Sequence, residues 1–167
     1  MTKFKICMLG AFAVGKTSLV RRYVHSIFDD KYQTTLGVKI DQKSLQVDDH
    51  DIELILWDLA GEDEFIKVRS SYLRGSAGAV LVADGTRGDT LDSVFTLREK
   101  LSDEVGEVPV VLLINKSDLS EQWNIDLYQL ELLRESGWHI IETSALNNDN
   151  VEQAFESLAR QILAVTA

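Results

Sequence analysis

The octapeptide at residues 10–17, G-A-F-A-V-G-K-T, constrains this chain most, because it matches the whole phosphate-binding loop pattern G-x-x-x-x-G-K-[ST]. An apolar run at residues 4–9 precedes it like a buried strand, and residues 18–24 follow with helical spacing. Gly10 and Gly15 permit backbone conformations closed to other residues, so that N–H groups at a helix N-terminus converge on a phosphate. We expect Lys16 to add a positive charge at the β- and γ-phosphates and the Thr17 hydroxyl to bind Mg²⁺. The order strand, loop, helix disfavours the alternative, a glycine turn beside a solvated lysine.

Composition bounds what else the chain can bind. Its 167 residues suit a single domain, 1–167, and are 45% hydrophobic and 26% charged, as in ordinary globular proteins. A formal net charge of -10 argues against general affinity for nucleic acid or for anionic membrane surfaces. Phosphate binding must therefore be local, built from backbone N–H groups, Lys16 and a metal ion.

The single cysteine indicates a reducing compartment, and the spacing of the histidines makes a zinc site unexpected. The single cysteine, Cys7, has no disulfide partner and is interpreted as a core residue rather than a reactive thiol. His25, His50 and His139 fall in different segments without ligand-like spacing. The first residues show no signal-peptide pattern, and no apolar run is long enough to span a bilayer. A cytoplasmic location is expected.

Strand-like and helix-like patterns alternate along the chain, which predicts an α/β fold with an open, mostly parallel six-stranded sheet and helices on both faces. Ligands in such a sheet bind beyond the carboxyl ends of the strands. Besides residues 4–9, the strand-like runs are 38–47, 51–57, 79–83, 110–114 and 139–141; besides residues 18–24, helical spacing occurs at 91–101, 127–135 and 151–163.

A second candidate site follows the run at 51–57, where the chain reads D-L-A-G-E from Asp58 to Glu62. Asp58 can hold a Mg²⁺-bound water, and Gly61 leaves room for its backbone N–H to approach a γ-phosphate. An Asp-x-x-Gly at a strand end is often only a turn. The phosphate loop upstream favours the metal and phosphate role.

A third and a fourth site follow the last two strand-like runs. Asp118 can accept hydrogen bonds from N1–H and the 2-amino group of guanine, whereas adenine has no such amino group and presents an acceptor at N1. Lys116 can lay its alkyl stem along the ring, and Asn115 can tie this loop to the phosphate loop. In the segment Thr143-Ser144-Ala145 a backbone N–H could donate to the guanine O6. These residues favour guanine over adenine.

In this order, the four sites resemble those of the small GTPase superfamily over essentially the whole chain. The Rab branch is the most similar: T-L-G-V at 35–38 resembles its T-I-G-V, residues 57–63 resemble W-D-T-A-G-Q-E, and Y-L-R-G at 72–75 resembles Y-Y-R-G. The resemblance implies a P-loop NTPase-type fold and a guanine-nucleotide switch that binds GTP or GDP with Mg²⁺ and hydrolyses GTP.

Two assignments rest on the resemblance alone. Thr35 matches the threonine whose hydroxyl joins Mg²⁺ only when a γ-phosphate is present, and Phe28 matches the aromatic residue that packs against the base. Read from the residues, Phe28 could equally be a core residue after the first helix, and Thr34-Thr35 a plain loop pair. The expected nucleotide contacts are Ala13, Val14, Gly15, Lys16, Thr17, Ser18, Phe28, Thr35, Gly61, Asn115, Lys116, Asp118, Ser144 and Ala145; the expected metal ligands are Thr17, Thr35 and Asp58; and the expected catalytic residues are Glu62, Lys16, Thr35 and Gly61.

Departures from the family pattern bear on hydrolysis and on partners. Glu62 stands where the family has the glutamine that orients the attacking water, and Phe12 occupies a position that is usually small, so slow hydrolysis is expected. Leu59 replaces a threonine, and Lys39-Ile40 replace an Asp-Phe pair, so the resemblance does not identify the effectors of this chain.

Residues 29–40 and 60–75 are expected to contact effector, exchange-factor and activating proteins, and the protein is expected to be a monomer. Residues 29–37 and 60–75 are rich in polar residues and glycine, so a γ-phosphate contacted by Thr35 and Gly61 would order them. The sequence ends at Ala167 without a cysteine-bearing or polybasic tail, so no direct membrane anchor is visible. This indicates either a truncated domain, peripheral to a membrane through a missing lipidated tail, or a GTPase that works without an anchor.

Two other functions remain open. One is a nucleotide-dependent interaction module with negligible GTP hydrolysis. The other is an ATP-using phosphotransferase, which Asp118 and the lack of an acceptor-binding domain disfavour.

Overall fold

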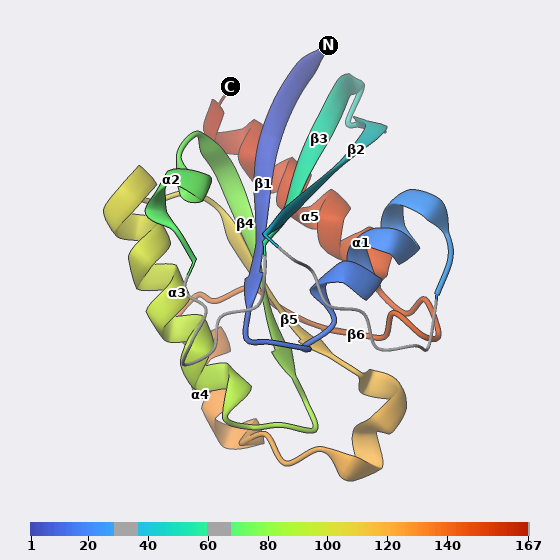
Figure 1. Cartoon of the computed structure of the whole chain (residues 1–167), viewed down its shortest axis with the longest axis vertical. Helices are drawn as coiled ribbons and strands as arrows, with labels where there is room; N and C mark the ends of the chain where they lie inside the picture. The colour runs from blue at the N-terminus through green and yellow to red at the C-terminus, as the bar shows by residue number, and fades with distance from the viewer. Residues whose placement is uncertain (29–36, 60–67, 167) are drawn as a thin grey trace.

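The sheet of this protein is mostly parallel, with one antiparallel edge strand. The computed structural model describes residues 1–28, 37–59 and 68–166. Strand order is β2-β3-β1-β4-β5-β6; only the β2–β3 pair is antiparallel among these described strands (Figure 1). The strands are β1 (Thr2–Gly10), β2 (Val38–Val47), β3 (His50–Leu59), β4 (Ser76–Asp84), β5 (Val110–Asn115) and β6 (Ile140–Thr143).

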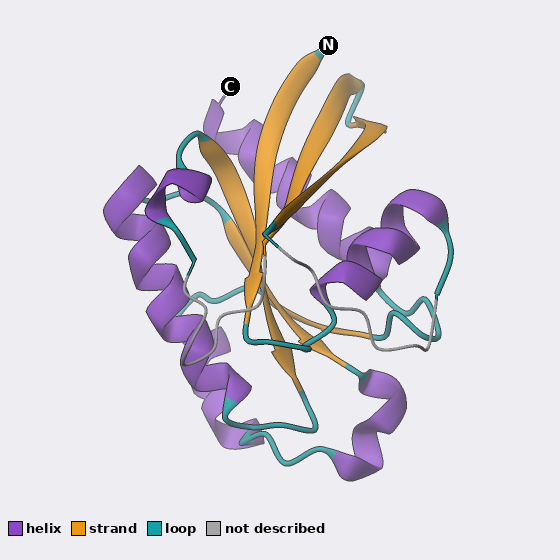
Figure 2. Cartoon of the chain, viewed as in Figure 1, coloured by secondary structure: helices purple, strands orange, loops and turns teal. Residues whose placement is uncertain are grey.

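Helices cover both faces of this sheet (Figure 2). One core cluster packs β-strand side chains against α1 and α5, around residues such as Leu19 and Phe155. A second cluster lies on the opposite face against α2, α3 and α4, around residues such as Leu97 and Leu130. The helical segments are α1 (Lys16–His25), α2 (Ser70–Leu73), α3 (Thr90–Val105), the 3₁₀ helix η1 (Ser117–Gln122), α4 (Leu127–Glu135) and α5 (Val151–Thr166).

The predicted fold class is confirmed, and the differences concern short elements. The four-residue helix α2 and the helix η1 were not predicted, because neither is long enough to show a helical period. The β2–β3 turn is tighter than expected: Asp48 and Asp49 take left-handed backbone angles, with φ of 48° and 67°, and His50 already belongs to β3. Cys7 is fully buried in the core, as predicted.

The parallel strands bring the predicted motifs to one edge of the sheet. Residues 10–17 follow β1, Asp58 lies near the end of β3, the segment from Lys116 follows β5, and Ser144 follows β6. Asp84, which the sequence analysis did not single out, ends β4 between them. Across the described ranges, none of the helices has the length and apolar character needed to cross a membrane.

Candidate functional site

The phosphate loop closes tightly over the start of α1. Gly15 precedes the helix with a left-handed φ of 107°, and Ala13 also has a positive φ, of 63°. A Cβ at Gly15 would overlap the Asn115 side-chain amide, and one at Gly10 would lie 2.5 Å from the Val82 carbonyl oxygen. Both glycines are therefore required by the close approach of neighbouring groups, but only Gly15 also takes a left-handed backbone angle, so the backbone freedom expected of Gly10 is not used.

Lys16 is buried inside this loop. Its Nζ donates to the carbonyl oxygens of Gly10, at 3.2 Å, and Ala11, at 3.3 Å. Burial lowers the pKa of Lys16 to about 8, helped by the positive charge of Arg87 and opposed by the negative charge of Asp58. Phosphate oxygens at this ammonium would favour its charged form and reverse the effect of burial.

Two of the three predicted metal ligands meet. Thr17 Oγ1 donates to Asp58 Oδ2 at 2.6 Å, although the residues are 41 positions apart, and Asp58 is fully buried. A hydroxyl and a carboxylate oxygen are the hard ligands that Mg²⁺ prefers, so the pair fits that ion. The third predicted ligand, Thr35, lies outside the described residues, as do Gly61 and Glu62.

Asn115 links the phosphate loop to the segment after β5. Its Nδ2 donates to the Val14 carbonyl oxygen at 3.0 Å, the link that the sequence analysis expected. Its Oδ1 accepts from Thr143 Oγ1 at 3.2 Å. One buried amide thus links the phosphate loop after β1 to the ends of β5 and β6.

The predicted base-reading carboxylate is oriented by a hydroxyl. Ser144 Oγ donates to Asp118 Oδ1 at 2.7 Å and accepts from the Asn147 backbone N–H at 3.0 Å. A backbone N–H of residues 143–145 was expected to contact the base, but the N–H of Ser144 donates to the Asp149 carbonyl oxygen at 3.1 Å. Ser144 therefore acts on Asp118 through its side chain, which leaves Ala145 as the candidate for the backbone contact.

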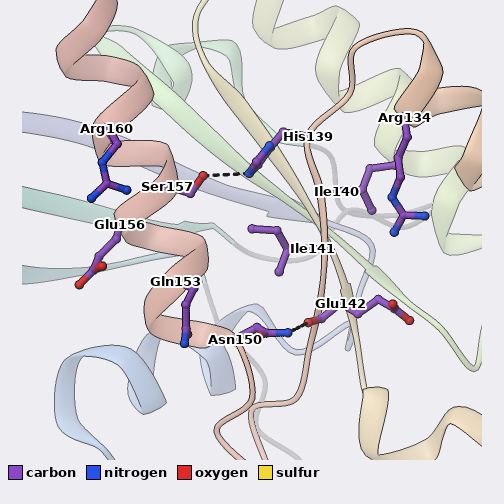
Figure 3. A pocket seen from close by; sticks show the side chains of 10 residues that line it. All are labelled: Arg134, His139, Ile140, Ile141, Glu142, Asn150, Gln153, Glu156, Ser157 and Arg160. Carbon is purple, nitrogen blue, oxygen red and sulfur yellow. Dashed lines mark hydrogen bonds between the residues drawn. The ribbon is translucent and has the colours of Figure 1, made fainter.

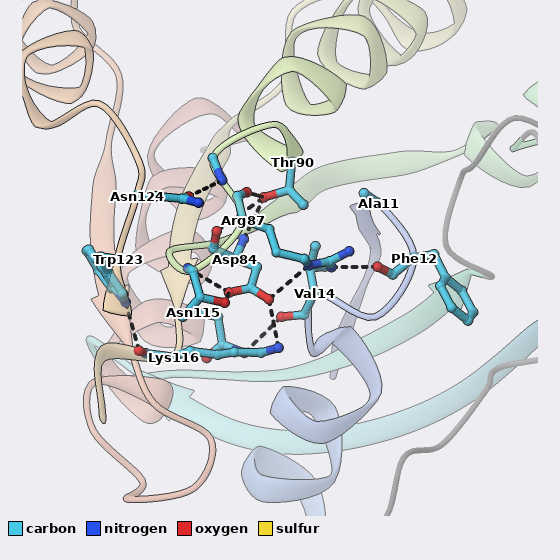
Figure 4. Close-up of polar contacts among 12 residues, drawn as sticks. Ala11, Phe12, Val14, Asp84, Arg87, Thr90, Asn115, Lys116, Trp123 and Asn124 are labelled. Carbon is cyan, nitrogen blue, oxygen red and sulfur yellow. Dashed lines mark hydrogen bonds and ion pairs between the residues drawn. The ribbon is translucent and has the colours of Figure 1, made fainter. Parts of the chain in front are cut away.

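Lys116 and Phe12 lie within a polar cluster around Asp84 (Figure 4). Lys116 has a left-handed φ of 73°, and its Nζ lies 2.7 Å from Asp84 Oδ2. Arg87 Nη2 donates to the Phe12 carbonyl oxygen at 2.6 Å. The Phe12 ring is 37% exposed and points away from the cluster.

Sequence reasoning missed several residues of this region. Asp84 was detectable, because it is a charged residue at the end of an apolar strand, the same position that identified Asp58. Arg22 had no such signal: its Nε donates to the Ala145 carbonyl oxygen at 2.8 Å and its Nη2 to that of Leu146 at 2.9 Å. Only the packing of α1 against the loop after β6 places it there.

The position of Phe28 is compatible with both of its interpretations, an aromatic contact to the base and a core residue after α1. It is half-buried and packs on the core cluster formed with α1 and α5. The Arg22 guanidinium carbon lies 5.9 Å from the centre of its ring.

A separate hollow between β6, α5 and the end of α4 contains none of the predicted site residues (Figure 3). Its polar groups bond within the chain: Ser157 Oγ lies 2.8 Å from His139 Nε2, and Asn150 Nδ2 donates to the Glu142 carbonyl oxygen at 2.9 Å. Nowhere in the described ranges do three or more histidine, cysteine or acidic side chains gather as a metal site.

Known proteins are similar to this chain in sequence over nearly its whole length. Residues 5–164 match the model of the Ras family. The Ras-related protein RABA5b of Arabidopsis thaliana is 35% identical over 161 residues, which are 95% of this chain and 74% of that protein. YPTC6 of Chlamydomonas reinhardtii is 34% identical, over 98% of this chain and 77% of its own length. Human Rab-25 is 34% identical, over 96% of this chain and 76% of its own length. The chain therefore belongs to the Ras family of small GTPases and is most similar to its Rab members.

Proposed function

We propose that this small GTPase binds GTP and GDP with Mg²⁺, hydrolyses GTP slowly, and presents residues 29–40 and 60–75 to effectors in the GTP state. The observation that carries the proposal is a set of three contacts among the predicted site residues at one sheet edge. Thr17 meets Asp58, Asn115 bonds to the carbonyl of Val14, and Ser144 orients Asp118.

Preference for guanine is supported by the hydrogen-bonding state of Asp118. Because Ser144 donates to Oδ1, the carboxylate is held in one orientation while its other oxygen can accept from a base. A carboxylate that only accepts suits the N1–H and 2-amino donors of guanine. It does not suit adenine, which presents an acceptor at N1.

Phosphate and metal contacts follow from the residues around α1. Backbone N–H groups at the start of α1 and the Lys16 ammonium would neutralise phosphate oxygens. Thr17 and Asp58, with Thr35, would hold Mg²⁺, and the ion would supply positive charge to offset the negative charge that develops on the phosphates. The Lys16 ammonium would also stabilise the negative charge that develops on the β–γ bridging oxygen as its bond to the γ-phosphorus breaks.

Slow hydrolysis is the part of the proposal that depends on Glu62 and Phe12. An ionised Glu62 about 4 Å from a γ-phosphate oxygen would meet a repulsion of roughly 4 kcal/mol per unit charge at an effective dielectric near 20. A glutamine can both donate and accept, whereas a carboxylate only accepts. The side chain of Phe12 adds bulk where an activating protein would insert an arginine.

Single-turnover hydrolysis of GTP by the parent and by Glu62→Gln tests this part. We expect the variant to be about tenfold faster, since relief of about 1.4 kcal/mol, roughly a third of that repulsion, changes a rate by a factor of ten. A slower variant would show that the carboxylate acts as a general base, and the proposal of slow hydrolysis would then be wrong. Asp103→Asn, an exposed change on α3, is the control.

The bound nucleotide distinguishes this function from its alternatives. Chromatography of the nucleotide released from protein purified with Mg²⁺ should show GDP or GTP, and a hundredfold excess of ATP should not displace it. Guanine nucleotide that is never hydrolysed over several hours would favour the interaction module. Displacement by ATP would contradict the proposal.

A further inference from the structure

We propose that Asp84 and Arg87 are positioning residues that couple the base-reading loop to the phosphate loop and so slow nucleotide release. The proposal rests on the proposed guanine-nucleotide binding and deepens it. Neither residue lies in the four sequence motifs: Asp84 ends β4, and Arg87 lies in the connection from β4 to α3.

Asp84 has a fully buried carboxylate with four hydrogen-bond or ion-pair partners. Oδ1 accepts from the Thr86 backbone N–H at 2.9 Å and from Thr86 Oγ1 at 2.7 Å. Oδ2 lies 2.7 Å from Lys116 Nζ and 3.2 Å from Arg87 Nε. A buried charge is tolerated only when it is paired and hydrogen-bonded, so the Asp84 carboxylate holds both cations in place. Burial alone would raise its pKa, but the bonds from Lys116 and Thr86 outweigh burial and keep the pKa below its usual range.

Arg87 extends this cluster to the phosphate loop. While its Nε pairs with Asp84, its Nη2 donates to the Phe12 carbonyl oxygen at 2.6 Å (Figure 4). A guanidinium is planar and rigid, so the two bonds set the distance between the end of β4 and the phosphate loop. A lysine could reach one of these partners at a time but could not span both with fixed geometry.

Both the side chain and the backbone of Lys116 bond to residues at or near the connection from β4 to α3. Its Nζ pairs with Asp84, and its carbonyl oxygen accepts from Trp123 Nε1 at 2.9 Å. The Trp123 indole covers Gly85, where a Cβ would overlap the ring, and the Asn124 backbone N–H donates to the Gly85 carbonyl oxygen at 3.0 Å. The base-reading loop is therefore built on the connection that follows Asp84.

These contacts join the loop expected to bind the base to the loop expected to bind the phosphates. Lys116 belongs to the loop expected to contact the base, and Phe12 to the loop expected to contact the phosphates. Holding both loops in place before binding lowers the entropy that binding would otherwise cost. Loss of the connection should therefore appear mainly as faster dissociation.

Dissociation of tritiated GDP into excess unlabelled GDP tests the coupling. We expect Arg87→Met to release GDP about tenfold faster than the parent, because the variant loses both charge-assisted hydrogen bonds between the end of β4 and the phosphate loop. Arg87→Lys should restore part of the difference. Since the bonds of Arg87 go to Asp84 and to the Phe12 carbonyl, we expect chelation of Mg²⁺ to accelerate GDP release from the parent and from Arg87→Met by the same factor.

Arg160→Met is the matched control. Arg160, on α5, makes the same kind of ion pair, with Nε 3.0 Å from Asp48 Oδ2. Its side chain is 55% exposed, and neither partner belongs to the predicted site. Its GDP release should stay within twofold of the parent. If Arg87→Met also stays within twofold, or if Arg87→Lys releases GDP as slowly as the parent, the coupling through both bonds of Arg87 is wrong.

Asp84→Asn adds a second test through a double-mutant cycle with Arg87→Met. Because both changes act through Asp84 Oδ2, the acceleration in the double variant should be smaller than the product of the two single accelerations. Fully multiplicative effects would overturn the coupling, and if Asp84→Asn does not fold, the Arg87 variants decide. A parent that binds no GDP would instead overturn the proposed function itself.

Discussion

At the scale of single residues, the hydrogen-bond partner of the Asp118 carboxylate determines how a substitution there changes base preference. Asp118 accepts from Ser144 through Oδ1. In Asp118→Asn the amide oxygen can keep that bond, which turns the NH₂ group toward the base. We expect GDP affinity to fall about tenfold to hundredfold, since hydrogen bonds to charged groups contribute about 1.5–3 kcal/mol, and preference to pass to xanthine nucleotides.

Competition binding with GDP and xanthosine diphosphate measures this change. Asp103→Asn, the same substitution at an exposed position of α3, should change neither affinity. A variant that still prefers GDP would show that Asp118 does not read the base.

Tyr23 carries a buried hydroxyl for which the described residues offer no hydrogen-bond partner. Its ring stacks on Phe155 with centres 4.2 Å apart, and burial raises the pKa of the hydroxyl. Tyr23→Phe removes the unpaired group but keeps the stack. We expect the free energy of unfolding in urea to stay the same or to rise by up to about 1 kcal/mol, because an unsatisfied buried polar group is costly. A loss above 1 kcal/mol would reveal a partner for the hydroxyl.

At the scale of elements, the start of α4 depends on one side chain. Asp126 accepts from the backbone N–H groups of Tyr128, at 3.0 Å, and Gln129, at 3.2 Å, so it caps the helix. We expect Asp126→Ala to lower the free energy of unfolding by about 1 kcal/mol, and Asp126→Asn, which keeps an accepting oxygen, to change it little. Urea unfolding of the GDP-loaded variants measures both. Equal losses in the two variants would contradict the capping role.

At the scale of the whole molecule, binding and folding are linked. Because the expected nucleotide contacts come from the ends of several strands, a ligand there binds only the folded chain. We expect GDP at a thousand times its dissociation constant to stabilise the protein by about 4.1 kcal/mol, and ADP at the same concentration to leave the unfolding temperature unchanged. Thermal unfolding against ligand concentration measures this difference. An equal shift with ADP would contradict guanine specificity.

Local patterns were enough to predict the layers of this fold. The apolar runs at residues 79–83 and 110–114 identify strands buried on both faces, and the spacing of residues 151–163 identifies α5, because burial imposes a period on the sequence. The same patterns did not predict η1 or α2. Both elements are too short for the spacing of apolar residues to show a helical period. The phosphate loop and the segment from Asn115 to Asp118 were recognisable because their chemistry requires fixed spacing along the chain.

The sequence by itself determined the order of the elements and which loops carry the predicted site, since periodicity and motif spacing are local properties. Only the tertiary structure decided the partners of those loops. Arg87 reaches the Phe12 carbonyl 75 residues away, and Arg22 reaches the carbonyl of Ala145 123 residues away. The first contact arises because β1 and β4 are neighbours in the sheet, and the second because α1 packs against the loop after β6. No local pattern encodes them, because the carbonyl groups that they bind are present in every residue.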